Sequence, residues 1–203
     1  NPLNYQALPC CFRPYKENGY THSPIPDIPG DVNMFGYFQS AKYFDNCPDL
    51  IRHHFTPKIE TEAFLRGLWA LELEEVTCSI HIRRGDYLIS PHIYPACTVD
   101  YYRNAVDYMK KNHGVTRFMV FGDDMGWARQ TLQGDEFTFV EGQKSIEDLF
   151  LMSFCDHNII ANSSFSWWGS YLNANPSKVV VAPRRWILNQ NAKDVYCPNW
   201  TIL

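Results

Sequence analysis

Two adjacent arginines, Arg83 and Arg84, follow an apolar stretch and precede the turn Gly85-Asp86. Guanidinium groups pair with phosphate oxygens in a bidentate manner and keep their charge at physiological pH. The arginine pair therefore predicts a site that grips a diphosphate. The structural alternative is that Asp86 pairs with one arginine and stabilises the turn. Arg84-Gly85-Asp86 also matches an adhesion tripeptide, but it adjoins a strand that we expect to be buried, which argues against that use.

A second polar segment, Asn162-Ser163-Ser164-Phe165, lies between an apolar stretch and an expected helix. Small hydroxyl residues at a helix N-terminus leave backbone N–H groups free to bind an anion. The plainer interpretation is a serine N-cap followed by Trp167 and Trp168 in the core. Because the arginine pair and this segment both follow strands, they converge on a phosphorylated ligand.

Acidic residues at two further positions could serve the same ligand. Asp123 and Asp124 follow Gly122, and adjacent acids can hold a divalent ion on a diphosphate. Their spacing is D-D where D-x-D is expected, so we favour Asp124 as a helix N-cap. Asp148 lies in the first turn of an expected helix, where an acid usually complements the helix dipole. A carboxylate facing the ligand could instead accept two hydrogen bonds from a guanine.

The elements that must position these residues alternate between strand and helix after residue 75. Apolar strands in such alternation predict an α/β fold with a parallel sheet covered on both faces. Ligands of these sheets lie beyond the carboxyl ends of the strands, where all the polar segments above fall. We expect Ser145 to cap the helix at 145–155, with Asp148 at the third position of that helix. The expected strands span 76–82, 117–121, 137–140, 157–161 and 178–182, and the expected helices span 99–111, 125–132, 145–155 and 165–173.

The region before residue 76 has a different character. Residues 1–33 are rich in proline and show no periodicity, which predicts an irregular arm. Short helices are expected at 40–44, from Cys47-Pro48-Asp49 onward, and at 61–73. The chain begins Asn1-Pro2-Leu3 without a methionine, so we expect it to lack its original start. We divide it into 1–75 and 76–203.

Composition excludes several classes of protein. The chain has 203 residues, 45% of them hydrophobic, and a net charge of −4, which gives no electrostatic case for a nucleic-acid partner. No charged-then-apolar pattern typical of a signal peptide opens the given sequence, and no apolar run reaches about 18 residues, so we expect no membrane span in it. Its seven cysteines form no pattern typical of a metal site, and vicinal Cys10-Cys11 is too strained for a disulfide, which favours a reducing compartment. Sequons at Asn162 and Asn199 matter only in a secretory lumen.

Several motifs in combination resemble the α-1,2-fucosyltransferase family, glycosyltransferase family 11. They are HIRRGDY at 81–87, DYY at 100–102, FGDD at 121–124, EDLFLMS at 147–153 and HNIIANSSFSWWGSYLN at 157–173. Upstream, GYFQSAKYF at 36–44 is similar to a further segment of that family. The resemblance runs from about residue 34 to 185.

The resemblance implies a GT-B-type enzyme of two Rossmann-like domains. Such an enzyme transfers fucose from GDP-β-L-fucose to the 2-hydroxyl of a galactose-terminated glycan acceptor, with inversion, without a cofactor and without a required metal. HIRRGDY opens the nucleotide-binding domain, so residues 76–203 are expected to be that domain. By the same resemblance Arg83 and Arg84 neutralise the departing GDP, Asp148 reads the guanine, His81 lies near the base, and the phosphates are surrounded by Asn162, Ser163, Ser164 and Phe165.

The resemblance leaves the catalytic base open between Asp86 and His92. The glycine-rich GGLGNQ-like start of the family is absent, so we expect residues 1–75 to be a remnant of the acceptor-side domain and much of the acceptor site to be missing. Two alternatives stand beside the fucosyltransferase: a metal-dependent sugar-nucleotide transferase using Asp123 and Asp124, which chelation would inactivate, and a non-catalytic nucleotide-sugar or glycan-binding domain. We expect a cytoplasmic location with peripheral association at the inner membrane face, and a Golgi lumen as the alternative.

Overall fold

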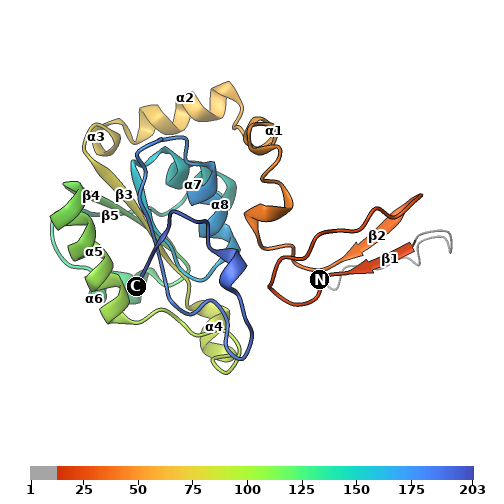
Figure 1. Cartoon of the computed structure of the whole chain (residues 1–203). Helices are drawn as coiled ribbons and strands as arrows, with labels where there is room; N and C mark the ends of the chain where they lie inside the picture. Colours follow the sequence, from red (N-terminus) through yellow and green to blue (C-terminus); the bar gives the residue numbers. More distant parts are fainter. Residues whose placement is uncertain (1–12) are drawn as a thin grey trace. The chain divides into compact units, whose positions relative to one another are not determined.

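The computed structural model describes residues 13–203, which form two compact units (Figure 1). The first unit comprises the residues up to Asn46 together with Gln190–Cys197. The second comprises Cys47–Asn189 and Pro198–Leu203. The division at residue 75 stays a prediction. None of the helices among residues 13–203 is long and apolar enough to cross a bilayer.

A six-stranded parallel sheet forms the centre of the second unit. Counted from β3 as strand 1, its order is 3-2-1-4-5-6, the order of doubly wound nucleotide-binding sheets. The chain therefore reverses its direction of travel across the sheet between β3 and β6. This arrangement confirms the predicted parallel α/β fold. Across the sheet lie β5 (Phe137–Phe139), β4 (Arg117–Gly122), β3 (Thr77–Ile82), β6 (His157–Ile159), β7 (Val180–Ala182) and β8 (Thr201–Ile202).

Helices cover both faces of this sheet, as predicted (Figure 1). One face packs against α5 (Val99–His113) and α6 (Met125–Thr131). The other packs against α7 (Ser145–Phe154) and α8 (Ser164–Leu172). Two further helices, α2 (Ile59–Leu68) and α3 (Ala70–Leu73), lie on the α7 side, while α1 (Pro48–His54) precedes them and α4 (Gly85–Ile89) follows β3.

Strand β3 is buried along its whole length, with alternate residues facing opposite layers. Cys78, Ile80 and Ile82 join the α5–α6 core. Their neighbours in sequence, Ser79 and His81, belong to the opposite face. Half of this strand is therefore polar yet buried, and its polar groups need partners on the α7–α8 side.

Asn158 of β6 supplies a partner for Ser79 at the centre of the α7–α8 layer. Its Nδ2 donates to the Ser79 hydroxyl at 2.7 Å and to the Met152 carbonyl at 2.8 Å. Asn173, just after α8, donates to Asn158 Oδ1 at 2.9 Å and to the Cys155 carbonyl at 2.7 Å. This buried network fixes α7 and α8 against the sheet, and with them the residues at its carboxyl edge.

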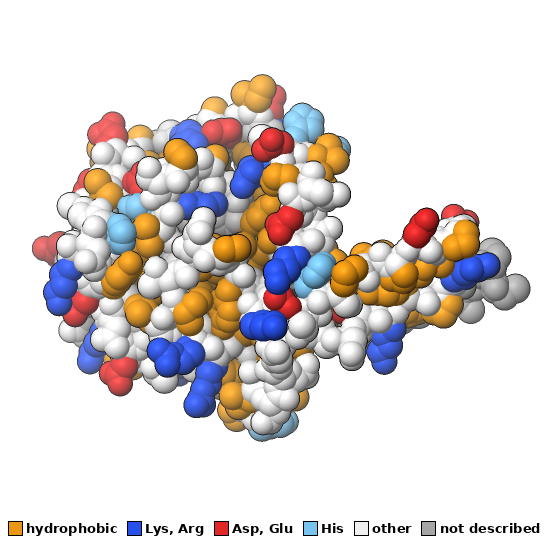
Figure 2. Space-filling model, in the orientation of Figure 1, with side chains coloured by type: hydrophobic (Ala, Val, Ile, Leu, Met, Phe, Trp, Pro, Cys, Tyr) orange, Lys and Arg blue, Asp and Glu red, His pale blue; other side chains and the backbone are white. Residues whose placement is uncertain are grey.

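The first unit contains two strands that the sequence pattern does not predict. Strands β1 (Arg13–Lys16) and β2 (Val32–Phe35) pair in parallel, so the expectation of an irregular arm was wrong for these residues. The short helices η1 (Ala41–Tyr43) and η2 (Lys193–Val195) complete the described part of this unit. Figure 2 shows hydrophobic side chains gathered over β1 and β2. Cys10 and Cys11 lie outside the described residues.

Other expectations in the second unit need smaller corrections. The predicted helix at 61–73 is interrupted at Trp69. Ser145 is the first residue of α7 rather than its cap, and Glu147 holds the third position, where its carboxylate accepts from the Lys144 N–H at 2.8 Å. Asp148 is consequently one position further along the helix than predicted. Helix α4 and strand β8 were not predicted.

Replacing Asn158 with alanine tests the role of the buried network. The change leaves the Ser79 hydroxyl and the Met152 carbonyl without a partner, and we expect the free energy of unfolding to fall by about 2–4 kcal/mol. Urea denaturation measures this loss. Asn104→Ala, at an exposed position of α5, is the control and should change stability by less than about 0.5 kcal/mol. Equal stability of the two variants contradicts the assignment.

Candidate functional site

The candidate site lies at the carboxyl edge of the sheet, where β3 and β6 are neighbours. In a doubly wound sheet the connections after these two strands diverge and leave a crevice for a ligand. The arginine pair follows β3, and the serine-rich segment follows β6. The fold therefore brings the two predicted phosphate-binding segments to the same place.

Arg83 is held between two carboxylates. One terminal nitrogen lies 2.8 Å from Asp86, and the other lies 3.0 Å from Asp123. The guanidinium also lies over the Tyr87 ring, 5.5 Å from its centroid. The structural alternative for Asp86, an ion pair with one of the arginines, is therefore confirmed. A phosphate that binds Arg83 has to share it with these acids.

Arg84 is held differently, with part of its guanidinium left open. Its Nε donates to Asp124 at 3.0 Å, and its guanidinium stacks 4.1 Å from the Trp127 ring centroid. The two terminal amino groups have no hydrogen-bond partner among residues 13–203. The Nε edge and one face of the Arg84 guanidinium are thus fixed. Its two terminal amino groups, which can bind a phosphate in a bidentate manner, remain open.

The carboxylate oxygens of Asp123 and Asp124 accept hydrogen bonds from other groups of the protein. Asp123 accepts from the backbone N–H groups of Arg84 at 2.8 Å and Gly85 at 3.1 Å, besides its contact with Arg83. Asp124 accepts from the Trp127 N–H at 3.0 Å, which confirms it as the N-cap of α6, and from Arg84. The Trp127 bond first, and Arg84 second, hold the pKa of Asp124 below its usual range. Both acids therefore serve to position the arginines.

The segment after β6 faces the same edge. Ser163 is the N-cap of α8, Ser164 is exposed, and the first turn of the helix leaves its N–H groups without helical partners. Phe165 contacts His81 of β3, with ring centroids 5.4 Å apart. This contact joins the two predicted segments directly. The N-terminus of α8, a typical anion-binding position, and the arginine pair thus lie at the same edge of the sheet.

Asn162 has a structural role that the sequence did not reveal. Its Nδ2 donates to the carbonyls of Pro95 at 3.0 Å and Trp186 at 2.9 Å, and its side chain is buried. Its own carbonyl accepts from the Tyr87 hydroxyl at 2.7 Å. Asn162 therefore ties the loops after β3, β6 and β7 together, and its sequon cannot carry a glycan in the folded chain. A role for Asn162 in ligand binding stays a prediction.

Two buried polar atoms near this edge have no partner in the described part of the chain: His81 Nδ1 and Asp148 Oδ1. Burial, and secondarily Arg83, lowers the pKa of His81 to about 3, so its imidazole is neutral. Burial, and secondarily Glu147, raises the pKa of Asp148 to about 6. Unsatisfied buried groups are costly and often mark ligand sites. Both atoms are available to a polar ligand such as a nucleobase.

The remaining candidates lie apart from this arrangement or inside the core. His92 is exposed in the turn after α4 and has no hydrogen bond or ion pair to the arginines among residues 13–203. Trp167 is buried and stacks on Tyr171 at 5.0 Å, which favours the core-packing interpretation. Trp168 stacks on Phe55 at 5.1 Å. Cys47, Cys78, Cys97 and Cys155 are free thiols.

Sequence reasoning missed the roles of Tyr87 and Trp127. Each aromatic ring lies against one arginine of the pair. Tyr87 comes shortly after its partner Arg83 in the sequence, whereas Trp127 is far from its partner Arg84 and comes shortly after Asp124. Burial raises the pKa of Tyr87 to about 12, so its hydroxyl remains a donor. The sequence signal that could have revealed these roles is an aromatic residue a few positions after a charged residue at the end of a strand.

Comparison with known proteins gives consistent matches. The profile described as glycosyl transferase family 11 matches residues 16–203. The chain is 35% identical over 180 residues to the O-antigen biosynthesis glycosyltransferase WbnK of Escherichia coli, covering 82% of this chain and 59% of that protein. It is 32% identical over 195 residues to an alpha-1,2-colitosyltransferase of Escherichia coli, covering 90% and 65%.

A mammalian relative matches over a similar region. The galactoside 2-alpha-L-fucosyltransferase SEC1 of Bos taurus is 29% identical over 182 residues, which cover 83% of this chain and 49% of that protein. The chain thus spans between about half and two thirds of the length of these relatives.

Asp148→Asn tests the desolvated carboxyl. Because the folded-state pKa is raised from 3.8 to about 6, the native state loses stability as pH rises through this interval. A shift of this size is worth about 3 kcal/mol for a fully buried group, and solvent around the half-buried carboxyl reduces it to about 1–2 kcal/mol. We expect the variant to be more stable than wild type by that amount at about pH 7.5 and equal to it at about pH 4.

Urea denaturation at both pH values measures the difference. Asp135→Asn, at an exposed acid, is the matched control and should leave stability unchanged at both. A variant that gains nothing at the higher pH shows that Asp148 is not desolvated in the folded chain.

Proposed function

Since the chain belongs to glycosyl transferase family 11, we propose that it carries the donor site of an enzyme that transfers L-fucose from GDP-β-L-fucose to the 2-hydroxyl of a galactose-like acceptor. The observation that carries the proposal is Arg84, fixed by Asp124 and Trp127 with its fork free at the sheet edge where α8 also begins. The relative named for galactoside fucosyl transfer supports the sugar and the acceptor.

Charge development explains why such a site accelerates transfer. Breaking a glycosyl–phosphate bond places positive charge on the sugar and negative charge on GDP. In the proposed complex Arg84 and the N–H groups of α8 face the second charge, and because the fold holds them in place they stabilise the transition state more than the ground state. Arg83 contributes a second positive charge when the diphosphate binds it, either beside Asp86 and Asp123 or in their place. This electrostatic stabilisation replaces a metal in the proposed mechanism.

We assign recognition of the guanine base to Asp148 and His81, whose buried polar atoms lack a partner in the described part of the chain. Asp148, charged above about pH 6, can accept hydrogen bonds from a guanine, and the neutral imidazole of His81 can meet a ring atom through Nδ1. Binding would give each atom the partner it lacks. Adenine, which offers a different donor pattern, would leave the Asp148 carboxylate unsatisfied.

The acceptor hydroxyl must lose a proton in an inverting displacement. Asp86 lies next to the arginines, 2.8 Å from Arg83, and its side chain is 62% exposed, so an acceptor can reach it. His92 has no contact with the arginines in the described part of the chain. We therefore assign proton acceptance to Asp86 in preference to His92.

Colitose is the second candidate for the transferred sugar. The relative named for α-1,2-colitosyl transfer is more similar to this chain than the bovine fucosyltransferase is. The proposed contacts to the diphosphate and the base suit a fucose donor and a colitose donor equally. Residues that contact the sugar must therefore distinguish the two. The metal-dependent alternative requires Asp123 and Asp124 to exchange their present hydrogen bonds for a metal ion.

Arg84→Ala tests the diphosphate contact. Losing a bidentate charged interaction should weaken GDP binding by at least about 100-fold, and transfer should disappear with it. Isothermal titration calorimetry with GDP measures the affinity, and urea denaturation checks that the fold is intact. Arg103→Ala removes an exposed arginine of α5 and should bind GDP as wild type does. Equal GDP affinity in wild type and Arg84→Ala overturns the assignment.

A further inference from the structure

The segment 36–44 of the first unit presents an exposed tyrosine that the donor site does not use. Tyr37 is 68% exposed, although it stacks on the buried Tyr20 with ring centroids 5.6 Å apart and planes 11° apart. One face of its ring is therefore backed by a second ring, while much of the remaining surface faces solvent. Figure 2 shows further hydrophobic side chains over the neighbouring β1 and β2.

A buried carboxylate fixes the backbone at this tyrosine. Glu17, only 7% exposed, accepts from the N–H groups of Tyr37 at 2.8 Å and Phe38 at 2.7 Å. It also accepts from the Tyr43 hydroxyl at 2.9 Å. Burying a carboxylate is costly unless hydrogen bonds compensate for it. All three of these bonds are spent on the segment that carries Tyr37.

The backbone on either side of Tyr37 is constrained further. Phe38 has φ +48°, a left-handed conformation that is unfavourable for a bulky residue. At Gly36 a Cβ atom would lie 2.4 Å from Cβ of Glu17, so only glycine fits. Strain of this kind persists where the surrounding structure enforces it, and it concentrates at functional positions.

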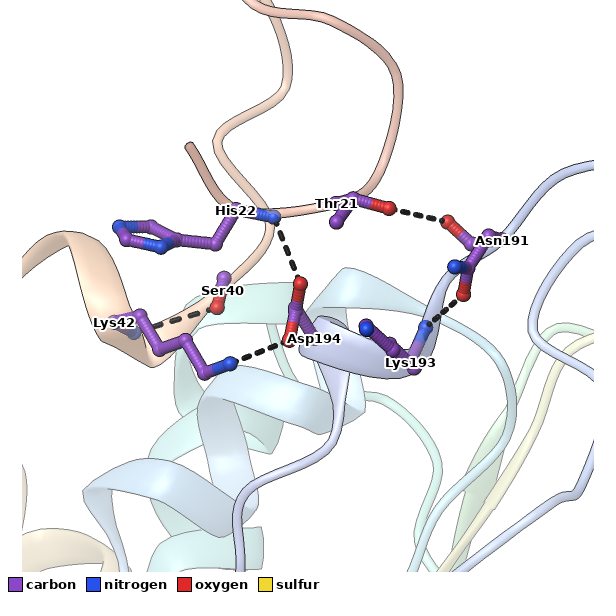
Figure 3. A network of polar contacts seen from close by, with 7 residues as sticks. All are labelled: Thr21, His22, Ser40, Lys42, Asn191, Lys193 and Asp194. Atoms are coloured by element: carbon purple, nitrogen blue, oxygen red, sulfur yellow. Dashed lines mark hydrogen bonds and ion pairs between the residues drawn. The ribbon is translucent and has the colours of Figure 1, made fainter. Parts of the chain in front are cut away.

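The far end of the segment is tied down as well (Figure 3). Lys42 pairs with Asp194 at 2.5 Å, and Asp194 also accepts from the His22 N–H at 3.1 Å. The Ser40 hydroxyl accepts from the Lys42 N–H at 3.3 Å. Lys42 first, and the His22 bond after it, hold the pKa of Asp194 below its usual range. The segment is thus fastened at both ends while Tyr37 stays exposed.

We propose that Tyr37, backed by Tyr20, is a stacking platform for a pyranose ring of the acceptor. The inference rests on the proposed function, which requires a galactose-like acceptor, and it assigns that acceptor a contact. The axial 4-hydroxyl of galactose leaves one face of its ring lined by C–H groups, which packs on an aromatic ring. A rigid tyrosine offers this surface at small entropic cost, and its fixed backbone preorganises it.

Ligand-observed NMR titration of the full chain with methyl β-D-galactoside tests the platform. Tyr37→Ala should weaken galactoside binding about tenfold or more, and Tyr37→Phe, which keeps the ring, should bind nearly as wild type does. Phe64→Ala removes a ring of comparable exposure, 58%, from α2 and is the matched control. Circular dichroism verifies that each variant is folded.

GDP affinity, measured by calorimetry on the same variants, separates this inference from the proposed function. Galactoside binding that depends on Tyr37 supports the platform even if GDP does not bind. Normal GDP binding together with equal galactoside affinity in wild type and Tyr37→Ala overturns the platform and leaves the donor site standing. Absence of measurable galactoside binding by wild type overturns it too.

Discussion

The site depends on the pairing of arginines with carboxylates across two neighbouring strands. Strands β3 and β4 are in register, with Ile82 opposite Gly122, so the residues that follow them meet at the edge of the sheet. Arg83 and Arg84 place two positive charges side by side, which repel unless acids neutralise them. Asp123 and Asp124 come from the neighbouring strand to do so. Without this register neither arginine has a fixed position.

The rest of the second unit serves to hold this edge. The buried network around Asn158 fastens α7 and α8 to the sheet, and the helices bring Asp148 and Phe165 to the site. Asn162 ties together the loops after three strands. The amide groups of the Asn158 network are paired with one another and with carbonyl groups, whereas His81 Nδ1 and Asp148 Oδ1 near the edge have no partner in the described part of the chain. A bound ligand can form hydrogen bonds with these two atoms and so offset the free-energy cost of burying them.

Much of this fold could be predicted from sequence because its signal is local. Alternating apolar strands and amphipathic helices after residue 75 predict a parallel α/β sheet, and the position of Arg83 and Arg84 after a strand places them at its carboxyl edge. The capping role of Asp124 is also local, since the acid directly precedes α6. These predictions needed no knowledge of which strands are neighbours.

The features that sequence did not reveal depend on contacts between distant segments. Pairing of Asp124 with Arg84 requires the β3–β4 register, and the amide of Asn162 finds its partners in loops far along the chain. Strands β1 and β2 are short and lie in a proline-rich region, so their pairing leaves no periodic signal. The stack of Tyr37 on Tyr20 likewise depends on Glu17, many residues away.

GDP affinity of Asp124→Asn, measured by calorimetry, tests the central claim most directly. Asparagine keeps an oxygen for the N-cap of α6 but presents an amide to Arg84 where a carboxylate stood. If Asp124 positions Arg84, GDP binding weakens by about tenfold or more, whereas Asp107→Asn, an equal charge change at an exposed position of α5, leaves it unaltered. If Asp124 merely competes with phosphate for the arginine, its neutralisation tightens GDP binding, and that result contradicts the account.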